Sequence, residues 1–200
     1  MDLRHYSDKS FAFDRDRQYN NTTPGPGWKP RGFWVTTPTE DGWLEWCKSE
    51  LFHIDNLETE SAVTLKDDAD LMIITTIESF DTFVDQYRAP LYPGAKPFGG
   101  KHEGINWPEV IEDYQGIIIA PYFYERRYDH MWYSSFDVAS GVIWDLGAVL
   151  RVETHMRTVS ETERREIAQR DKEHKEFMEK LKKESFYPRT GTLETWAVVD

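Results

Sequence analysis

Short runs of β-forming residues and a few amphipathic stretches follow one another irregularly along this 200-residue chain. Runs of aliphatic and aromatic residues bounded by Gly, Pro or polar residues favour strands. Such runs lie at residues 3–7, 32–37, 62–66, 71–77, 116–120, 131–135, 141–152 and 192–199. Because they do not form repeating strand–helix–strand units, they predict an α+β fold rather than a Rossmann-type sheet.

Three segments before residue 115 carry helical signals. In the clearest, a capping serine precedes large apolar residues that recur at i, i+3, i+4 and i+7. These residues are Ser79, Phe80, Phe83, Val84 and Tyr87. Residues 41–52 present an aromatic face at helical spacing, and residues 106–114 begin with Asn106 as the expected N-cap. Between these helices, residues 89–104 are rich in Pro and Gly and predict a long loop.

The end of the chain has a different character. Ser160-Glu161-Thr162-Glu163 matches a capping box and opens a charged helix that runs to about Lys183. Apolar residues are sparse in this helix, so we expect it to be exposed, either solvated or partly on a partner. We expect residues 1–158 to form the main domain and residues 159–200 to add this helix and a closing strand to the same domain.

Composition narrows the classes of function. The formal net charge of −12 argues against a general nucleic-acid or acidic-membrane binder, while local recognition of a nucleotide stays open. The lone Cys47 cannot form an internal disulfide, which fits a reducing compartment. No signal peptide is evident at the start, and the longest apolar runs are far too short to span a bilayer. We therefore expect a soluble, cytoplasmic protein.

Several common catalytic motifs do not occur. The sequence has no Gly-x-Gly-x-x-Gly and no Walker A phosphate loop. It has no Cys-x-x-Cys or His-Glu-x-x-His, and its six His residues show no metal-ligand spacing, so no metal site is expected. The chain is instead rich in aromatic residues, which make up 14 % of the sequence and include eight Trp. The aromatic segments are therefore the remaining candidates for a functional site.

Three segments, taken in chain order, contain the candidate site residues. His5-Tyr6-Ser7 ends the first expected strand. Gly32-Phe33-Trp34 lies in the second strand, after Lys29-Pro30-Arg31, and Trp46-Cys47 follows in the next helix. A late strand carries Val142-Ile143-Trp144-Asp145 after a turn.

In this order the segments resemble the ADP-ribosyltransferase superfamily, on the branch of diphtheria toxin and the poly-ADP-ribose polymerases. That branch has a His at a strand end, a Gly-x-Tyr strand, and a second aromatic residue on the following helix. It also has a Glu at the head of an aliphatic-aliphatic-aromatic-Asp strand, and Ser140 stands at the corresponding position here. The resemblance touches residues 3–152, and the runs around Trp34 and Trp144 further resemble small proteins of tailed bacteriophages.

The resemblance implies a split β-sandwich with flanking helices that binds NAD, in a host-cell cytoplasm if the gene is a phage gene. His5 would hold a ribose hydroxyl, the backbone of Tyr6 would bind the nicotinamide carboxamide, and Ser7 would support the same pocket. Gly32 would begin the second motif. The nicotinamide ring is a flat cation, so Trp34 and Trp46 would stack on it.

The implied reaction is cleavage of the nicotinamide–ribose bond, by an NAD-dependent ADP-ribosyltransferase or NAD glycohydrolase. Its oxocarbenium-like transition state calls for a carboxylate near the ribose. Ser140 cannot supply one, so Asp137 is the best substitute and Asp145 the next. Two alternatives stay open: a non-catalytic module that binds a nucleotide or inhibits a host protein, and an assembly protein whose Trp-rich face packs on a partner. The acceptor of ADP-ribose is left open.

Overall fold

The computed structural model describes residues 1–21, 29–54, 57–90 and 103–184. They fall into two compact units, one within Met1–Thr158 and the other within Val159–Asp200. The strands of the first unit are β1 (Leu3–Ser7), β2 (Phe33–Thr36), β3 (Thr59–Leu65), β4 (Leu71–Ile74), β5 (Arg88–Pro90), β6 (Glu103–Ile105), β7 (Gly116–Ile119), β8 (Ser140–Ile143) and β9 (Val149–Met156). Its helices are α1 (Trp43–Glu50), α2 (Ile77–Gln86) and α3 (Trp107–Asp113), with 3₁₀ turns η2 (Tyr133–Ser135) and η3 (Leu146–Ala148). The expectation that both units form one domain stays a prediction.

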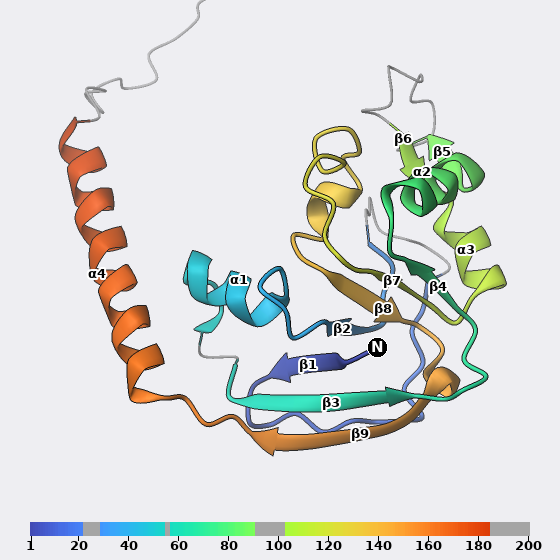
Figure 1. The fold of residues 1–200 in the computed structure, drawn as a ribbon, viewed down its shortest axis with the longest axis horizontal. Helices are drawn as coiled ribbons and strands as arrows, with labels where there is room; N and C mark the ends of the chain where they lie inside the picture. The colour runs from blue at the N-terminus through green and yellow to red at the C-terminus, as the bar shows by residue number, and fades with distance from the viewer. Residues whose placement is uncertain (22–28, 55–56, 91–102, 185–200) are drawn as a thin grey trace, which may run out of the picture. The chain divides into compact units, whose positions relative to one another are not determined.

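Seven strands form one open sheet in the order β4-β7-β8-β2-β1-β3-β9 (Figure 1). Strands β4 and β7 run parallel, and every other neighbouring pair in this sheet is antiparallel. Strands β5 and β6 form a separate two-stranded pair. This mixed architecture confirms the α+β class predicted from the irregular order of elements.

The sheet is weakly joined between β1 and β2. Only Arg4 and Thr36 pair across this junction, whereas β1 pairs with β3 through all five of its residues. Strand β2 in turn pairs with β8 through all four of its residues. The two strands therefore separate on one side of the Arg4–Thr36 pair, and this separation positions the site described below.

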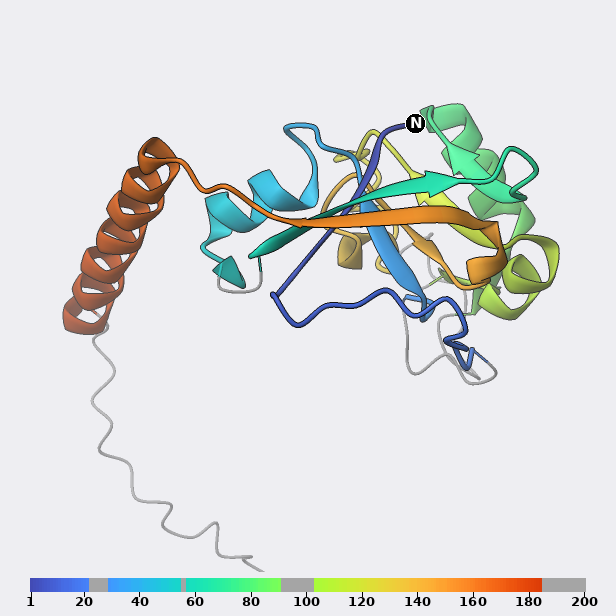
Figure 2. The ribbon, with the colours of Figure 1, turned by 90° about the horizontal axis from the view of Figure 1, so that it is seen from below.

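Each face of the sheet has its own core. One face, which we call the helix face, is covered by α2, α3 and the segment of residues 132–139. Its strands contribute Ile74, Ile117, Ile119 and Val142. The opposite face, which we call the loop face, carries Leu3, Phe33, Val35, Ile118 and Ile143. Phe11, Phe13 and Tyr19 pack on it from residues 8–21, a segment without regular structure that runs along the sheet (Figure 2).

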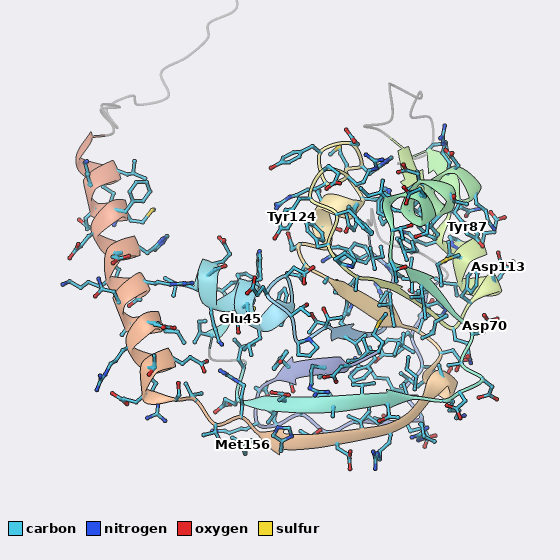
Figure 3. The ribbon with its side chains drawn as sticks, in the orientation of Figure 1. Glu45, Asp70, Tyr87, Asp113, Tyr124 and Met156 are labelled. Atoms are coloured by element: carbon cyan, nitrogen blue, oxygen red, sulfur yellow. The ribbon has the colours of Figure 1, made fainter. Side chains whose placement is uncertain are left out.

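Aromatic rings fill most of the core on the helix face. Trp132 is 1 % exposed and stacks on Phe80, with ring centroids 5.6 Å apart and planes 7° from parallel. Trp107 meets Trp132 edge-on at 5.7 Å. At the edge of this core, the Tyr87 hydroxyl donates to an Asp113 carboxylate oxygen at 2.6 Å and so links α2 to α3 (Figure 3). Large rings thus supply buried area that the modest number of aliphatic residues does not.

Helix α2 confirms the amphipathic pattern but not its expected cap. Phe80, Phe83 and Val84 are buried on one face of the helix, as their spacing predicts. The helix starts one turn earlier than expected, because Thr76 is the N-cap. The Thr76 hydroxyl accepts a hydrogen bond from the Ser79 amide, and the Ser79 hydroxyl accepts one from the Thr76 amide. Ser79 therefore closes a capping box from inside the helix.

The prediction of a strand at residues 131–135 is wrong. This segment forms turns and the 3₁₀ turn η2, and Trp132, Tyr133 and Phe136 all enter the same core. A strand would send adjacent side chains to opposite faces of a sheet. The long strand predicted at residues 141–152 is instead two strands, β8 and β9, with η3 between them.

Some of the other predicted strands are confirmed, whereas parts of the predicted loop and the predicted closing strand lie outside the described residues. The runs at residues 3–7, 33–36 and 116–119 are strands, as expected. The predicted loop at residues 89–104 begins and ends in the β5–β6 pair, and residues 91–102 lie outside the described part of the chain. The expected closing strand at residues 192–199 also lies outside it.

The second unit contains α4 (Glu161–Glu184). The Ser160 hydroxyl accepts a hydrogen bond from the Glu163 amide at 3.1 Å, which confirms Ser160 as the cap. Ion pairs one turn apart, such as Arg165–Glu161 and Lys175–Asp171, line its surface. Within the described ranges of the chain, none of the helices has the length and apolar character needed to cross a membrane.

Candidate ligand-binding site

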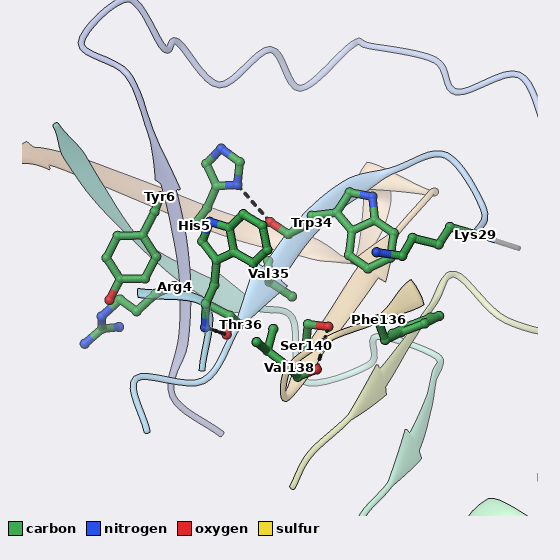
Figure 4. A pocket seen from close by; sticks show the side chains of 11 residues that line it. Arg4, His5, Tyr6, Lys29, Trp34, Val35, Thr36, Phe136, Val138 and Ser140 are labelled. Carbon is green, nitrogen blue, oxygen red and sulfur yellow. Dashed lines mark hydrogen bonds between the residues drawn. The ribbon is translucent and has the colours of Figure 1, made fainter. Parts of the chain in front are cut away.

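A cavity of about 340 Å³ opens where β1 and β2 separate (Figure 4). Three strands contribute to it from the helix face of the sheet. Their residues are Arg4 and Tyr6 of β1, Trp34 and Thr36 of β2, and Ser140 of β8. Arg4 pairs with Thr36 and Thr36 pairs with Ser140, so side chains in these alternating positions share one face.

Loops and a helix complete the walls. Lys29 comes from the segment before β2, Phe136 and Val138 from the segment before β8, and Trp43 from the first turn of α1. Trp34 meets Phe136 edge-on, with ring centroids 5.4 Å apart. Aromatic side chains from three separate parts of the sequence thus border one cavity.

The Lys29 ammonium lies against two of these rings. Its Nζ is 5.0 Å from the centroid of Trp34 and 5.7 Å from that of Phe136. Both distances are within the range of a cation–π contact. Burial lowers the pKa of Lys29, and the negative charge of Asp137 acts in the opposite direction. Lys29 is therefore a half-buried cation held by aromatic faces.

The Lys and Arg side chains that line the cavity are not matched by carboxylates in the lining. Arg4 and Lys29 both line it, and none of the described residues that line it carries a carboxylate. The Arg4 guanidinium is already bound by Asp2 and, at 2.8 Å, by Glu60. Lys29 is thus the cation of the lining that has no carboxylate bound to it among the described residues, in a protein whose net charge is −12.

Hydroxyl groups hold the walls in place. The Thr36 hydroxyl donates to the Ala139 carbonyl at 2.7 Å and accepts from the Trp43 amide at 2.9 Å. It therefore fixes the start of α1 and the segment before β8 relative to β2. The Ser140 hydroxyl is buried and donates to the Val138 carbonyl at 3.0 Å. Ser140 borders the cavity as predicted, with its only proton directed to the backbone.

His5 lies at the boundary of the cavity, but its ring packs on the loop face. The imidazole contacts Phe11 at 4.6 Å and Phe33 at 4.7 Å between ring centroids. Its Nδ1 donates to the Trp34 carbonyl at 2.8 Å, across the gap between β1 and β2 (Figure 4). The ring therefore joins the two strands where their backbones do not pair. The Nδ1 proton is therefore already engaged, and the contact of His5 with a ribose hydroxyl stays a prediction.

The burial of His5 makes a testable contribution to stability. Burial lowers its pKa below 6.5, and the bond to the Trp34 carbonyl opposes this shift only in part. The folded protein thus keeps His5 neutral at a pH at which the unfolded chain binds a proton. This contribution to stability is present above pH 6.5 and is lost as the pH falls through the folded-state pKa.

We expect His5→Asn to be less stable than wild type at pH 7.5, by about 1–2 kcal/mol, because it loses the ring contacts. Asn keeps a donor near the position of Nδ1 and does not titrate, so the difference should shrink between pH 7.5 and pH 5. Urea unfolding at both values measures it. A difference that does not change with pH would show that His5 does not titrate as inferred.

The other predicted contacts lie outside the cavity. Trp46 does not line it but stacks on Trp43 at 5.1 Å and so supports that wall from behind. The Ser7 hydroxyl shares a hydrogen bond with Thr59 at 2.8 Å. Gly32 borders a smaller cavity on the loop face and packs so closely that a Cβ would meet the Ile143 carbonyl oxygen at 2.7 Å.

The two candidate carboxylates differ in position. Asp137 has a positive φ of 63° and lies between Phe136 and Val138, which both line the cavity. Asp145 accepts hydrogen bonds from the Gly147 amide and the Gln115 side chain, both at 2.8 Å. Asp145 therefore caps η3, and Asp137 is the candidate close to the cavity.

The sequence predicts Tyr6, Trp34 and Ser140 as members of one site, and all three line the cavity. Lys29, Arg4 and Trp43 were not predicted as members of the site. Strand alternation was the available signal for Arg4, since it places Arg4 and Tyr6 on one face of β1. No comparable local signal indicated that the Lys29 side chain would turn toward the Trp34 ring.

Comparison with other proteins does not assign this chain to a family or a function. No family model matches the chain, and neither the curated proteins nor the solved structures gave a match. In the described part of the chain, no three His, Cys, Asp or Glu side chains are grouped so as to hold a metal ion. A functional proposal therefore depends on the chemistry of the cavity.

Proposed function

We propose that this chain binds a nucleotide of the NAD class in the cavity between β1 and β2. The observation that carries the proposal is the meeting of Trp34, Trp43 and Phe136 around one opening. Flat heteroaromatic rings bind to such side chains by stacking. A cavity of about 340 Å³ falls in the range of small-molecule sites, about 300–1,000 Å³.

The family resemblance supports the same site. Tyr6, Trp34 and Ser140 come from the three segments that resemble the ADP-ribosyltransferases, and all three border the cavity. The separation of β1 from β2 fits the split β-sandwich that the resemblance implies. We therefore propose an ADP-ribosyltransferase-like fold as the finer description of this α+β domain.

Binding without cleavage is the form of the proposal that the lining residues favour. Stabilising an oxocarbenium-like transition state calls for a carboxylate close to the ribose. None of the described lining residues provides one, and the Ser140 hydroxyl bonds to the backbone. ADP-ribosyl transfer or NAD hydrolysis is the second candidate, favoured by Asp137, whose charge acts on Lys29 at the cavity.

We expect Trp34→Ala to weaken NAD binding about 10- to 100-fold, because stacking on one aromatic side chain contributes about 1–3 kcal/mol. Titration calorimetry measures the affinity directly. Trp34→Phe should retain most of it, and Tyr124→Ala is the control, since Tyr124 is 55 % exposed and does not line the cavity. Equal affinities for wild type and Trp34→Ala would contradict the assignment of this cavity.

Nicotinamide release separates the two candidate functions. Wild-type protein that binds NAD without releasing nicotinamide is a binding module. Release that is lost in Asp137→Asn, with NAD affinity retained, would support transfer or hydrolysis with Asp137 as the carboxylate. If the wild type neither bound NAD nor released nicotinamide, both forms of the proposal would fail.

A further inference from the structure

Lys29 is the feature of the cavity that the proposed function leaves unexplained. It stands directly before Pro30, and its side chain reaches into the cavity beside Trp34 (Figure 4). The ammonium lies 5.0 Å from the Trp34 ring centroid and 5.7 Å from that of Phe136. Lysine side chains usually extend into water, so a half-buried ammonium between two rings needs a reason.

The two cations of the cavity differ in their partners. Arg4 is engaged by two carboxylates, one of them Glu60 at 2.8 Å. Within the described ranges, no ion pair with a carboxylate engages Lys29; Asp137 acts on it through space. Lys29 is thus the cation of this cavity whose charge is still available to a ligand.

The position of the Lys29 ammonium also limits which ligand rings can stack on Trp34. A cationic ring placed on the same face of Trp34 would meet the Lys29 ammonium, and like charges at short range repel. An anionic group near Nζ would instead be attracted, more strongly here than in water because the surroundings are partly apolar. The cavity therefore favours a ligand that brings negative charge to Lys29 and an uncharged ring to the remaining aromatic wall.

We infer that Lys29 binds the diphosphate of the nucleotide, so that the cavity selects nucleoside diphosphates, with the uncharged base stacked on the aromatic wall that Trp34 and Trp43 form. This inference rests on the proposed nucleotide site and specifies its ligand class. Diphosphate is common to ADP, ADP-ribose and NAD, so all three are expected to bind. The nicotinamide ring then contributes little to affinity, in contrast to the stacking that the family resemblance implies for Trp34.

The acid–base behaviour of Lys29 agrees with this role. Burial lowers its pKa in the free protein. A phosphate group binds the charged ammonium, so affinity should fall when the pH is raised through that pKa. Added salt should also weaken binding of ADP, because the attraction is between charges.

The test compares ADP, ADP-ribose and adenosine by titration calorimetry. Wild type is expected to bind ADP and ADP-ribose similarly and adenosine at least about 10-fold more weakly, because adenosine lacks the charged partner of Lys29. Lys29→Met should weaken ADP binding about 10-fold or more and leave the weak adenosine binding unchanged. Lys29→Arg should keep most of the ADP affinity. The control is Lys66→Met, an exposed lysine outside the cavity.

Each failure has a distinct meaning. If Lys29→Met bound ADP as tightly as wild type while Trp34→Ala lost binding, the nucleotide site would stand and the role of Lys29 would be wrong. That role would also be wrong if adenosine bound to wild type as tightly as ADP. If wild type bound none of ADP, ADP-ribose and NAD, the proposed function would fail and this inference with it. Circular dichroism of each variant establishes that its fold is retained.

Discussion

Replacing Trp132 with alanine is expected to lower the free energy of unfolding by about 3–5 kcal/mol, the usual range for a fully buried tryptophan. Trp132 is 1 % exposed and touches aromatic rings on several sides. It stacks on Phe80 at 5.6 Å and meets Trp107 edge-on at 5.7 Å. Alanine would leave a large void, and surrounding rings cannot collapse into it without losing their own contacts.

Chemical denaturation followed by circular dichroism measures this loss. Met131→Ala is a matched control from the neighbouring position, because Met131 is 38 % exposed and should change stability by less than about 1 kcal/mol. Trp132→Phe should fall between the two. A loss below about 1 kcal/mol for Trp132→Ala would mean that residues 132–136 are not part of the core.

The second large effect is expected at Gly141, in the middle of β8. A Cβ added there would lie 2.5 Å from the Ile117 carbonyl oxygen and 2.7 Å from Ile118 Cγ1. The first contact is with the backbone of β7, so a side-chain rotation cannot relieve it. We expect Gly141→Ala to destabilise the domain by about 3 kcal/mol, the upper end of the usual range for overpacking.

Gly147→Ala is the matched control for this variant. A Cβ at Gly147 would meet Asp145 Oδ1 at 2.8 Å, and that oxygen belongs to a side chain that can turn away. Its cost should be clearly smaller than that of Gly141→Ala in the same denaturation experiment. Equal losses for the two variants would show that close approach of β7 and β8 is not what requires glycine at position 141.

Local patterns were enough to predict α2 and the buried strand β7. Helix α2 repeats its large apolar residues with the period of a helix, and Gly116–Ile119 lies in a short apolar run between Gln115 and Pro121. The segment 131–136 shows where such patterns fail. It is rich in aromatic residues that favour strands, but contacts with distant Phe80 and Trp107 decide its conformation.

The site was predictable only in part for a similar reason. Alternation along β1 and β2 determines which side chains share a face within each strand. It does not determine that β1 and β2 are neighbours joined by one residue pair, which depends on residues far apart in sequence. The packing of the His5 ring between these strands was not predicted for this reason, since the ring fills the gap that the weak pairing leaves.

The His5–Trp34 bond has a consequence for how the cavity can change its width. Two fully paired strands can be spread apart only by breaking several ladder hydrogen bonds together. Here β1 and β2 are held by the Arg4–Thr36 pair and by one imidazole. On that side a single hydrogen bond, with a net contribution of about 1 kcal/mol, and the packing of the His5 ring on Phe11 and Phe33 take the place of a ladder. We therefore expect this opening, rather than the fully paired strands of the sheet, to adjust when ligands of different thickness bind.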